Sequence, residues 1–188
     1  MKKVLIIQGH PNPESLNAAI GEAYKKGALT AKAEVQEIIV QDLDFNPSYT
    51  ADLELEPDLQ KAQKQILWAD HIVIIHPLWW GGIPALLKGF IDRVFLPGFA
   101  YKFKEGSVWW DKLLKGRTGR IIYTMDQPYF YYNWVNGKPS INQLKKMTME
   151  FCGITPTRTT AFGPVRTATA EGRQKWLEKV EQLGRKVE

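Results

Sequence analysis

Short, continuous apolar runs alternate along the chain with longer segments in which apolar residues recur every three or four positions. The runs are rich in β-branched residues, which predicts strands of a parallel sheet that is covered on both faces. The continuous runs lie at residues 4–7 and 71–76, and further strands are expected at residues 34–40, 119–125 and 155–162. The periodic segments predict amphipathic helices. They lie at residues 13–24, 57–69, 84–95, 140–152 and 170–186.

Five strands that alternate with five helices predict an α/β fold, a parallel sheet with helices on both faces. The chain length favours the flavodoxin-like arrangement, in which five strands lie in the order 2-1-3-4-5. We expect residues 1–188 to form a single flavin-binding domain of this type, because this length suits one hydrophobic core. Two connections are unusually long, residues 41–56 and 97–118.

The composition is that of an ordinary globular protein, with 44% apolar and 24% charged residues. The longest apolar run, residues 71–80, is too short for a transmembrane segment, which takes roughly twenty residues. The first apolar run is too short for a signal peptide, so we expect a cytoplasmic protein. The single cysteine, Cys152, excludes an internal disulfide and a cysteine-ligated metal cluster.

Charge is distributed unevenly between the two halves of the chain. Residues 1–94 carry 9 Lys/Arg and 12 Asp/Glu, whereas residues 95–188 carry 16 and 8. The basic residues of the second half are scattered, which is typical of a solvated surface and argues against a nucleic-acid site. The same charge would suit attraction of an anionic nucleotide or a peripheral membrane partner.

A ligand of such a fold binds beyond the carboxyl ends of the strands, where the strand order reverses. Three loops reach that position, residues 9–17, 77–84 and 125–134. The first loop opens a helix, whose free N–H groups suit a phosphate, and His10, Ser15 and Asn17 add side-chain donors. The alternative is that Ser15 only caps the helix and Asn17 faces water. The chain has neither a GxGxxG nor a P-loop motif, which excludes the common dinucleotide and ATP folds.

Aromatic residues gather in the same part of the chain, since 15 of the 22 lie between Trp79 and Trp134. Trp79 and Trp80 stand next to each other in an extended loop, where neighbouring side chains point in opposite directions, so both are hard to bury. The third loop holds five aromatic residues between positions 129 and 134. This pattern favours a pocket for a flat, conjugated ligand or a contact between two copies of the chain.

Other chemistries find no support in the sequence. His10 and His76 lie at the ligand end of the predicted sheet and His71 lies at the opposite end, so we expect no metal site. Ser15 is not part of a G-x-S-x-G nucleophile elbow. Cys152 ends a helix without a basic neighbour on the ligand side, and we expect it to be inert.

The three loops carry the markers of a known family. Gly9-His10 is followed by Ser15-Leu16-Asn17, and a long block runs from Pro77 to Phe95 and continues in Phe99-Ala100-Tyr101. With these markers most of the chain resembles the NAD(P)H:quinone oxidoreductases of the flavodoxin-like superfamily, the group of DT-diaphorase and the modulator-of-drug-activity proteins. The resemblance implies a non-covalently bound flavin and hydride transfer from NAD(P)H through flavin N5 to quinones, with azo or nitro compounds as side substrates. It also implies a homodimer in which both chains wall each pocket.

The resemblance assigns individual residues to the flavin. Those at the ribityl phosphate would be His10, Ser15, Leu16, Asn17 and Ala19. Those along the isoalloxazine would be Pro77, Leu78, Trp79, Trp80 and Gly81, and those on its pyrimidine side Thr124, Met125 and Asp126. An ungapped count places Tyr132 and Lys138 at the family's charge-stabilising tyrosine and histidine, so they are the expected catalytic pair. The chain lacks the C-terminal extension of the mammalian enzymes, which favours FMN over the alternative FAD.

Two other functions stay open at this point. One is an electron-carrier flavodoxin, against which the pI of 9.2 argues. The other is an ancillary regulatory flavoprotein subunit of a potassium-efflux transporter, which the basic second half would suit. Within the helix at 84–95 we interpret Lys88, Asp92 and Arg93 as structural, with an i,i+4 pair between the first two. Gly89, in the middle of that helix, predicts close packing of another chain.

Overall fold

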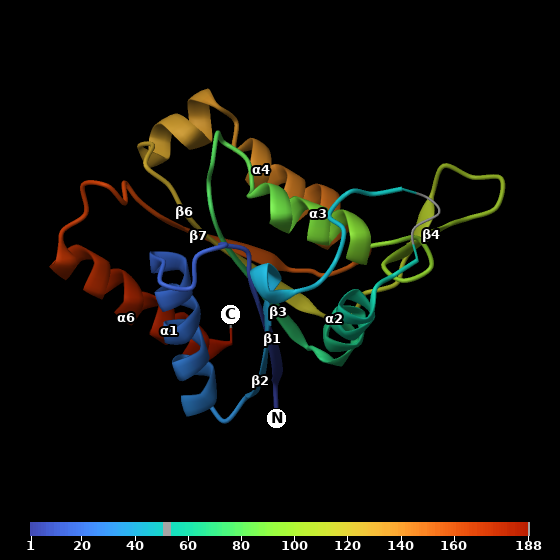
Figure 1. The fold of residues 1–188 in the computed structure, drawn as a ribbon, viewed down its shortest axis with the longest axis horizontal. Helices are drawn as coiled ribbons and strands as arrows, with labels where there is room; N and C mark the ends of the chain where they lie inside the picture. The colour runs from blue at the N-terminus through green and yellow to red at the C-terminus, as the bar shows by residue number, and fades with distance from the viewer. Residues whose placement is uncertain (51–53, 188) are drawn as a thin grey trace.

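Five parallel strands form the central sheet of the molecule (Figure 1). The computed structural model describes residues 1–50 and 54–187. The strands are β1 (Lys3–Gln8), β2 (Glu34–Ile39), β3 (His71–Pro77), β6 (Thr118–Thr124) and β7 (Thr157–Phe162). Their order in the sheet is β2-β1-β3-β6-β7, and every neighbouring pair is parallel. The flavodoxin-like order predicted from the sequence is therefore confirmed.

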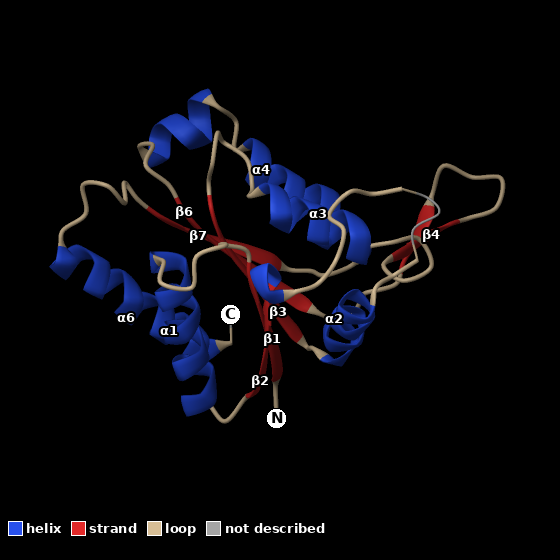
Figure 2. Cartoon of the chain, viewed as in Figure 1, coloured by secondary structure: helices blue, strands red, loops and turns tan. Residues whose placement is uncertain are grey.

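Helices cover both faces of this sheet (Figure 2). On one face lie α1 (Leu16–Thr30) and α6 (Ala170–Lys186), which contact each other along their length. The other face is covered by α2 (Pro57–Trp68), α3 (Ala85–Val94) and a continuous helical segment. That segment runs from α4 (Pro139–Asn142) through the π-helical η3 (Gln143–Met149) to α5 (Glu150–Cys152).

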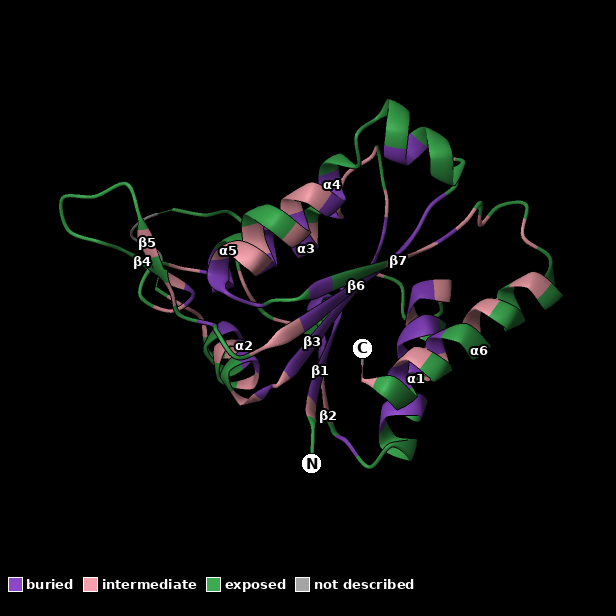
Figure 3. Ribbon diagram, turned by 180° about the vertical axis from the view of Figure 1, so that it is seen from behind, coloured by how far each residue is buried: buried purple, intermediate pink, exposed green. Residues whose placement is uncertain are grey.

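The central strands β1 and β3 are mostly apolar because each of their faces meets a helix layer, whereas the edge strands β2 and β7 also carry exposed polar residues. In β1, Val4 and Ile6 belong to the core beneath α1 and α6, whereas Leu5 and Ile7 belong to the core beneath α2 and α3. All four are completely buried, and Figure 3 shows purple along the central strands, whereas β7 also carries exposed residues. A strand with two buried faces has no polar alternation, which explains the continuous runs in the sequence.

Helix starts follow the capping residues of the sequence. Ser15 caps α1, and its hydroxyl oxygen accepts a hydrogen bond from the Ala18 N–H at 3.2 Å. Thr169 caps α6 in the same way through the Gly172 N–H. Pro57 occupies the first turn of α2, where its missing N–H leaves no hydrogen bond unmade.

The long connection at residues 97–118 contains a hairpin that the sequence pattern did not predict. Its strands are β4 (Tyr101–Phe103) and β5 (Trp110–Lys112), paired antiparallel. Three residues are too few to show an alternating pattern, and both strands are partly or fully exposed. Trp110 stacks on Phe151 of α5 at 4.2 Å between ring centroids, which ties the hairpin to the helix layer.

The other long connection, residues 41–56, begins with the 3-10 turn η1 (Val40–Asp42), and its residues 51–53 lie outside the described structure. It passes over α3, where Pro47 Cβ lies 2.5 Å from the position that a Cβ on Gly89 would take. The expectation that Gly89 makes room for another chain is therefore wrong, because its close neighbour belongs to the same chain. Lys88 and Asp92 form the expected i,i+4 pair at 2.6 Å. No helix in the described part of the chain is long and apolar enough to cross a membrane.

Candidate active site

A cavity of about 220 Å³ lies at the carboxyl ends of β1, β3 and β6, where the sheet order reverses. All three loops predicted from the sequence contribute to it. Its lining consists of His10, Ser15, Leu16, Asn17, Pro77, Leu78, Trp79, Thr124, Met125, Asp126 and Val165. Ten of these eleven residues are among the thirteen assigned to the flavin by resemblance.

The floor of the cavity is set by a hydrogen bond between two loops. The Asn17 side-chain amide donates to Thr124 Oγ1 at 2.9 Å, and both residues are buried. The other polar atom of the same side chain, Asn17 Oδ1, has no hydrogen-bond partner within the described residues. A buried acceptor of this kind calls for a donor, and a ligand in the cavity can supply one. The alternative in which Asn17 faces water does not hold.

His10 forms one wall of the cavity in a defined protonation state. Its Nδ1 accepts a hydrogen bond from the Asn12 N–H at 2.9 Å, so the neutral ring carries its hydrogen on Nε2. Partial burial holds the pKa of His10 below its ordinary value. Its ring meets Trp79 edge to face, with 5.6 Å between the centroids. His10 is therefore a neutral donor beside an aromatic wall.

The loop after β3 closes in a tight turn. Trp79 and Gly82 exchange two backbone hydrogen bonds of 2.9 and 3.0 Å, and the two central residues have positive φ, 54° for Trp80 and 74° for Gly81. This is the arrangement of a type I′ turn, which glycine adopts freely and tryptophan does not. Trp80 is fully exposed and Trp79 is 46% exposed, so neither ring fills the core.

Three residues assigned to the flavin do not line the cavity. Ala19 lies on the exposed side of α1, one turn from the helix start. Trp80 and Gly81 form the tip of the turn just described, beside the cavity rather than in its wall.

Val165 was missed by the sequence analysis, although it follows a predicted strand at the ligand end of the sheet. Its N–H donates to the Met125 carbonyl at 3.0 Å, and the next N–H, of Arg166, donates to the Asp126 carboxylate at 2.6 Å. Asp126 thus holds the β7–α6 loop against the cavity. The signal that could have revealed this loop is Gly163-Pro164, directly after the fifth apolar run.

The expected catalytic pair lies apart from the cavity lining. Tyr132, in the π-helical η2 (Tyr131–Val135), is completely buried, and its hydroxyl is 2.7 Å from Ser140 Oγ. Lys138 is exposed and has positive φ, 52°, and its backbone N–H donates to the Tyr132 carbonyl at 3.1 Å. The two residues are connected to each other through the backbone, and their catalytic role stays a prediction.

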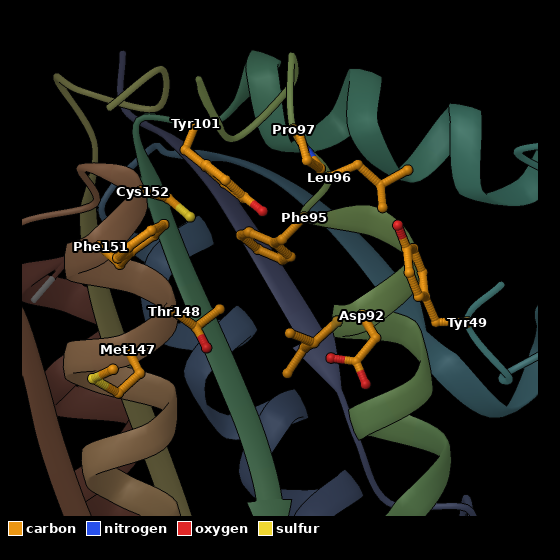
Figure 4. A pocket seen from close by; sticks show the side chains of 11 residues that line it. Tyr49, Asp92, Phe95, Leu96, Pro97, Tyr101, Met147, Thr148, Phe151 and Cys152 are labelled. Carbon is orange, nitrogen blue, oxygen red and sulfur yellow. The ribbon is translucent and has the colours of Figure 1, made fainter. Parts of the chain in front are cut away.

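A second, larger cavity of about 490 Å³ lies at the other end of α3 (Figure 4). Asp92 and Phe95 face it from α3 and the residue that follows, and Thr148 and Phe151 face it from the helical segment opposite. Its walls are mainly apolar and aromatic. This cavity is not at the carboxyl ends of the strands, so the fold does not make it the primary ligand site.

The described residues contain no cluster of three or more side chains suited to a metal ion. Burial raises the pKa of the Cys152 thiol to about 12, so this thiol is not a nucleophile at neutral pH.

Comparison with known families agrees with this geometry. Residues 2–183 match the model of a protein family described by its flavodoxin-like fold, and the chain belongs to this family. A crystal structure of Smu.1420 from Streptococcus mutans superimposes with a TM-score of 0.87 at 34% identity, over 98% of this chain and 99% of that one.

Curated relatives carry the names of oxidoreductases. An uncharacterised NAD(P)H oxidoreductase of Haemophilus influenzae is 31% identical over 93% of this chain and 90% of its own length. Another of that description, YcaK of Escherichia coli, is 32% identical over 61% of this chain, and the match spans 65% of its length. The mouse ribosyldihydronicotinamide dehydrogenase [quinone] is 27% identical over 81% of this chain and 78% of its own length.

Proposed function

We propose that this chain is an FMN-dependent NAD(P)H oxidoreductase that reduces quinones, and also azo or nitro compounds, by two electrons at a time. The single observation that carries the proposal is the cavity where the strand order reverses, with its buried and unpaired acceptor Asn17 Oδ1. The names of the bacterial and mouse relatives support the same class of reaction.

The residues of the cavity fit FMN. The start of α1 offers backbone N–H groups and a partial positive charge to a phosphate. The hydroxyl groups and the ring N–H of FMN are donors, which is what Asn17 Oδ1 lacks within the described residues. Leu78 and Trp79 present apolar surface to a flat ring. We propose FMN rather than FAD, because the lining contains no further group for an adenine.

FMN bound here would supply the two-electron redox chemistry between NAD(P)H and an acceptor. The chain itself binds and orients the reactants. His10 donates from Nε2 while remaining neutral, so it holds a ligand atom without adding charge. Trp79 and the exposed Trp80 give a planar nicotinamide or quinone an apolar surface and displace water from it.

Tyr132 and Lys138 are proposed to compensate the negative charge that grows on the pyrimidine side of the ring. A lysine at this place brings a full positive charge in place of a histidine. The Tyr132 hydroxyl is bonded to Ser140 Oγ, so its role as a donor requires that it exchange this partner. The 188 residues would form a single flavin-binding domain.

A homodimer is part of the proposal. The cavity at the strand ends is open, and exposed aromatic residues surround it. We propose that the cavity between α3 and the helical segment η3–α5, where Tyr101 and Phe151 lie (Figure 4), packs against the second copy. Two copies related by a twofold axis would wall each site from both chains. Because NAD(P)H is a cytoplasmic metabolite, we place the enzyme in the cytoplasm.

Flavin retention tests this proposal directly. Purified protein is incubated with FMN or FAD, desalted, and examined by visible absorption, and the retained flavin is then released and identified. We expect stoichiometric FMN and steady NAD(P)H oxidation when a quinone is added. A protein that retains neither flavin overturns the proposal. Light scattering of the same sample gives the oligomeric state, and a monomer would contradict the shared site.

A further inference from the structure

His76 is completely buried at the end of β3, one residue before the cavity lining begins. Its Nδ1 lies 2.9 Å from the Pro77 carbonyl oxygen. A carbonyl can only accept, so Nδ1 carries the ring hydrogen and donates it. The ring lies nearly parallel to that of Tyr123 on the neighbouring strand β6, with 6.3 Å between the centroids.

The second ring nitrogen of His76, Nε2, is buried and makes no hydrogen bond with the described residues. A buried acceptor without a donor destabilises the folded state. A phenylalanine would fill the same space next to Tyr123 without that penalty, so packing alone does not account for a histidine here.

The hydrogen bond that His76 does make fixes the base of a ligand loop. Pro77 has no N–H to hold it in place, and its carbonyl accepts from His76. On the other side of the same peptide, the Leu78 N–H donates to the Thr124 carbonyl at 2.8 Å. Both the C=O and the N–H of the Pro77–Leu78 peptide bond are therefore hydrogen-bonded, directly before the turn at residues 79–82.

We propose that His76 is a positioning residue, whose Nδ1–H holds the Pro77 carbonyl and so orients the loop at residues 77–82 toward the ligand. Its effect on the loop is a property of the chain alone. Its effect on FMN affinity rests on the proposed function. Burial lowers the pKa of His76 to about 4, so at physiological pH the ring stays neutral, with its hydrogen on Nδ1 and none on Nε2.

Two substitutions of His76 separate the effect of its hydrogen bond to Pro77 from the effect of its side-chain volume. His76→Phe keeps the volume and removes the donor, whereas His76→Asn places an amide N–H near the position of Nδ1 and leaves a gap. His71→Phe is the matched control, because His71 is equally buried at the opposite end of the same strand. The measurements are hydrogen exchange of the amides at residues 78–82 without ligand, the FMN dissociation constant, and the urea midpoint.

We expect His76→Phe to be as stable as the wild type. Its amide hydrogens at residues 78–82 should exchange about three to ten times faster, and its FMN dissociation constant should rise about three- to tenfold, because one hydrogen bond is lost. His76→Asn should be less stable but closer to the wild type in both loop readouts. His71→Phe should leave both unchanged. Unchanged exchange in His76→Phe overturns the inference, as does equal loosening in His71→Phe. A wild type that binds no FMN overturns the proposed function, and the exchange data still decide on His76.

Discussion

The side-chain amide of Asn17 donates a hydrogen bond of 2.9 Å to Thr124 Oγ1, across 107 residues of sequence. This contact joins the first turn of α1 to the last residue of β6, and it lies at the floor of the candidate site. It leaves Asn17 Oδ1 pointing to no partner among the described residues. One side chain therefore joins two loops of the candidate site, and we propose that its unpaired carbonyl oxygen binds the ligand.

Replacement of Asn17 should separate these two tasks. Asn17→Ala removes both the contact and the free acceptor, and we expect a loss of about 1–3 kcal/mol in the free energy of unfolding together with at least tenfold weaker FMN binding. Thr124→Val removes the contact but keeps Asn17 Oδ1, so it should lose similar stability and less affinity. Urea unfolding and quenching of FMN fluorescence measure the two effects. Equal losses of affinity in both variants would contradict a direct contact between Asn17 and the ligand.

Stability should fall in mild acid because of two buried histidines. Burial lowers the pKa of His71 and of His76 to about 4, and the nearby Arg120 and Lys2 add to the shift of His71. The unfolded chain binds these protons near pH 6.5, so between about pH 6.5 and 4 it holds more protons than the folded chain, and stability decreases as the pH falls.

The slope of the free energy of unfolding against pH tests the role of the two histidines. Each histidine contributes up to about 1.4 kcal/mol per pH unit inside that window. Urea midpoints of the wild type should therefore drop clearly between about pH 7 and 5. His71→Phe should remove roughly half of the drop, and the double variant with His76→Phe most of it. A double variant with the slope of the wild type would contradict the assignment.

We expect Trp80 to lower the free energy of unfolding and to contribute to the binding of NAD(P)H or quinone. Its φ of 54° lies in the left-handed region, which is unfavourable for tryptophan by roughly 1–2 kcal/mol. Asparagine tolerates this conformation and precedes glycine in the commonest type I′ turns. We expect Trp80→Asn to raise the free energy of unfolding by about 1 kcal/mol and to weaken the binding of NAD(P)H or quinone.

An exposed tryptophan elsewhere is the control for that substitution. Trp109 is 68% exposed and is not among the residues with positive φ, so Trp109→Asn should bring no gain in stability. Thermal unfolding and steady-state kinetics give the two readouts. A Trp80→Asn variant that is less stable than the wild type would show that the ring supports the fold.

Arg93 should be far more important for stability than its neighbour Lys88. Its guanidinium is buried and pairs with Glu56 at 2.7 Å, and it also donates to the carbonyls of Asn46 and Glu54. Arg93→Met removes the ion pair with Glu56 and leaves the Asn46 and Glu54 carbonyls without this donor, so it should cost about 3–5 kcal/mol in the free energy of unfolding. Lys88→Met, which removes an exposed pair on the same helix, should cost no more than about 0.5 kcal/mol. Similar urea midpoints for the two variants would contradict this.

The sequence by itself determined the sheet and the place of the candidate site. Strands with two covered faces must be apolar throughout, and β1 and β3 show this without any tertiary information. Five strands that alternate with helices in a chain of this length predict the flavodoxin-like order, and a ligand site is expected where that order reverses. The exposure of Trp79 and Trp80 and the pair of Lys88 and Asp92 are equally local, and both are confirmed.

Only the tertiary structure decided which side chains meet across long stretches of sequence. Three such contacts join separate elements. Asn17 bonds to Thr124, Pro47 packs against Gly89, and Val165 lines the cavity. No periodicity records such pairs, because they depend on how helices and loops settle on the sheet rather than on which residues face it. The hairpin of β4 and β5 belongs with them, since Trp110 and Phe151 hold it in place through a stacking contact made by folding.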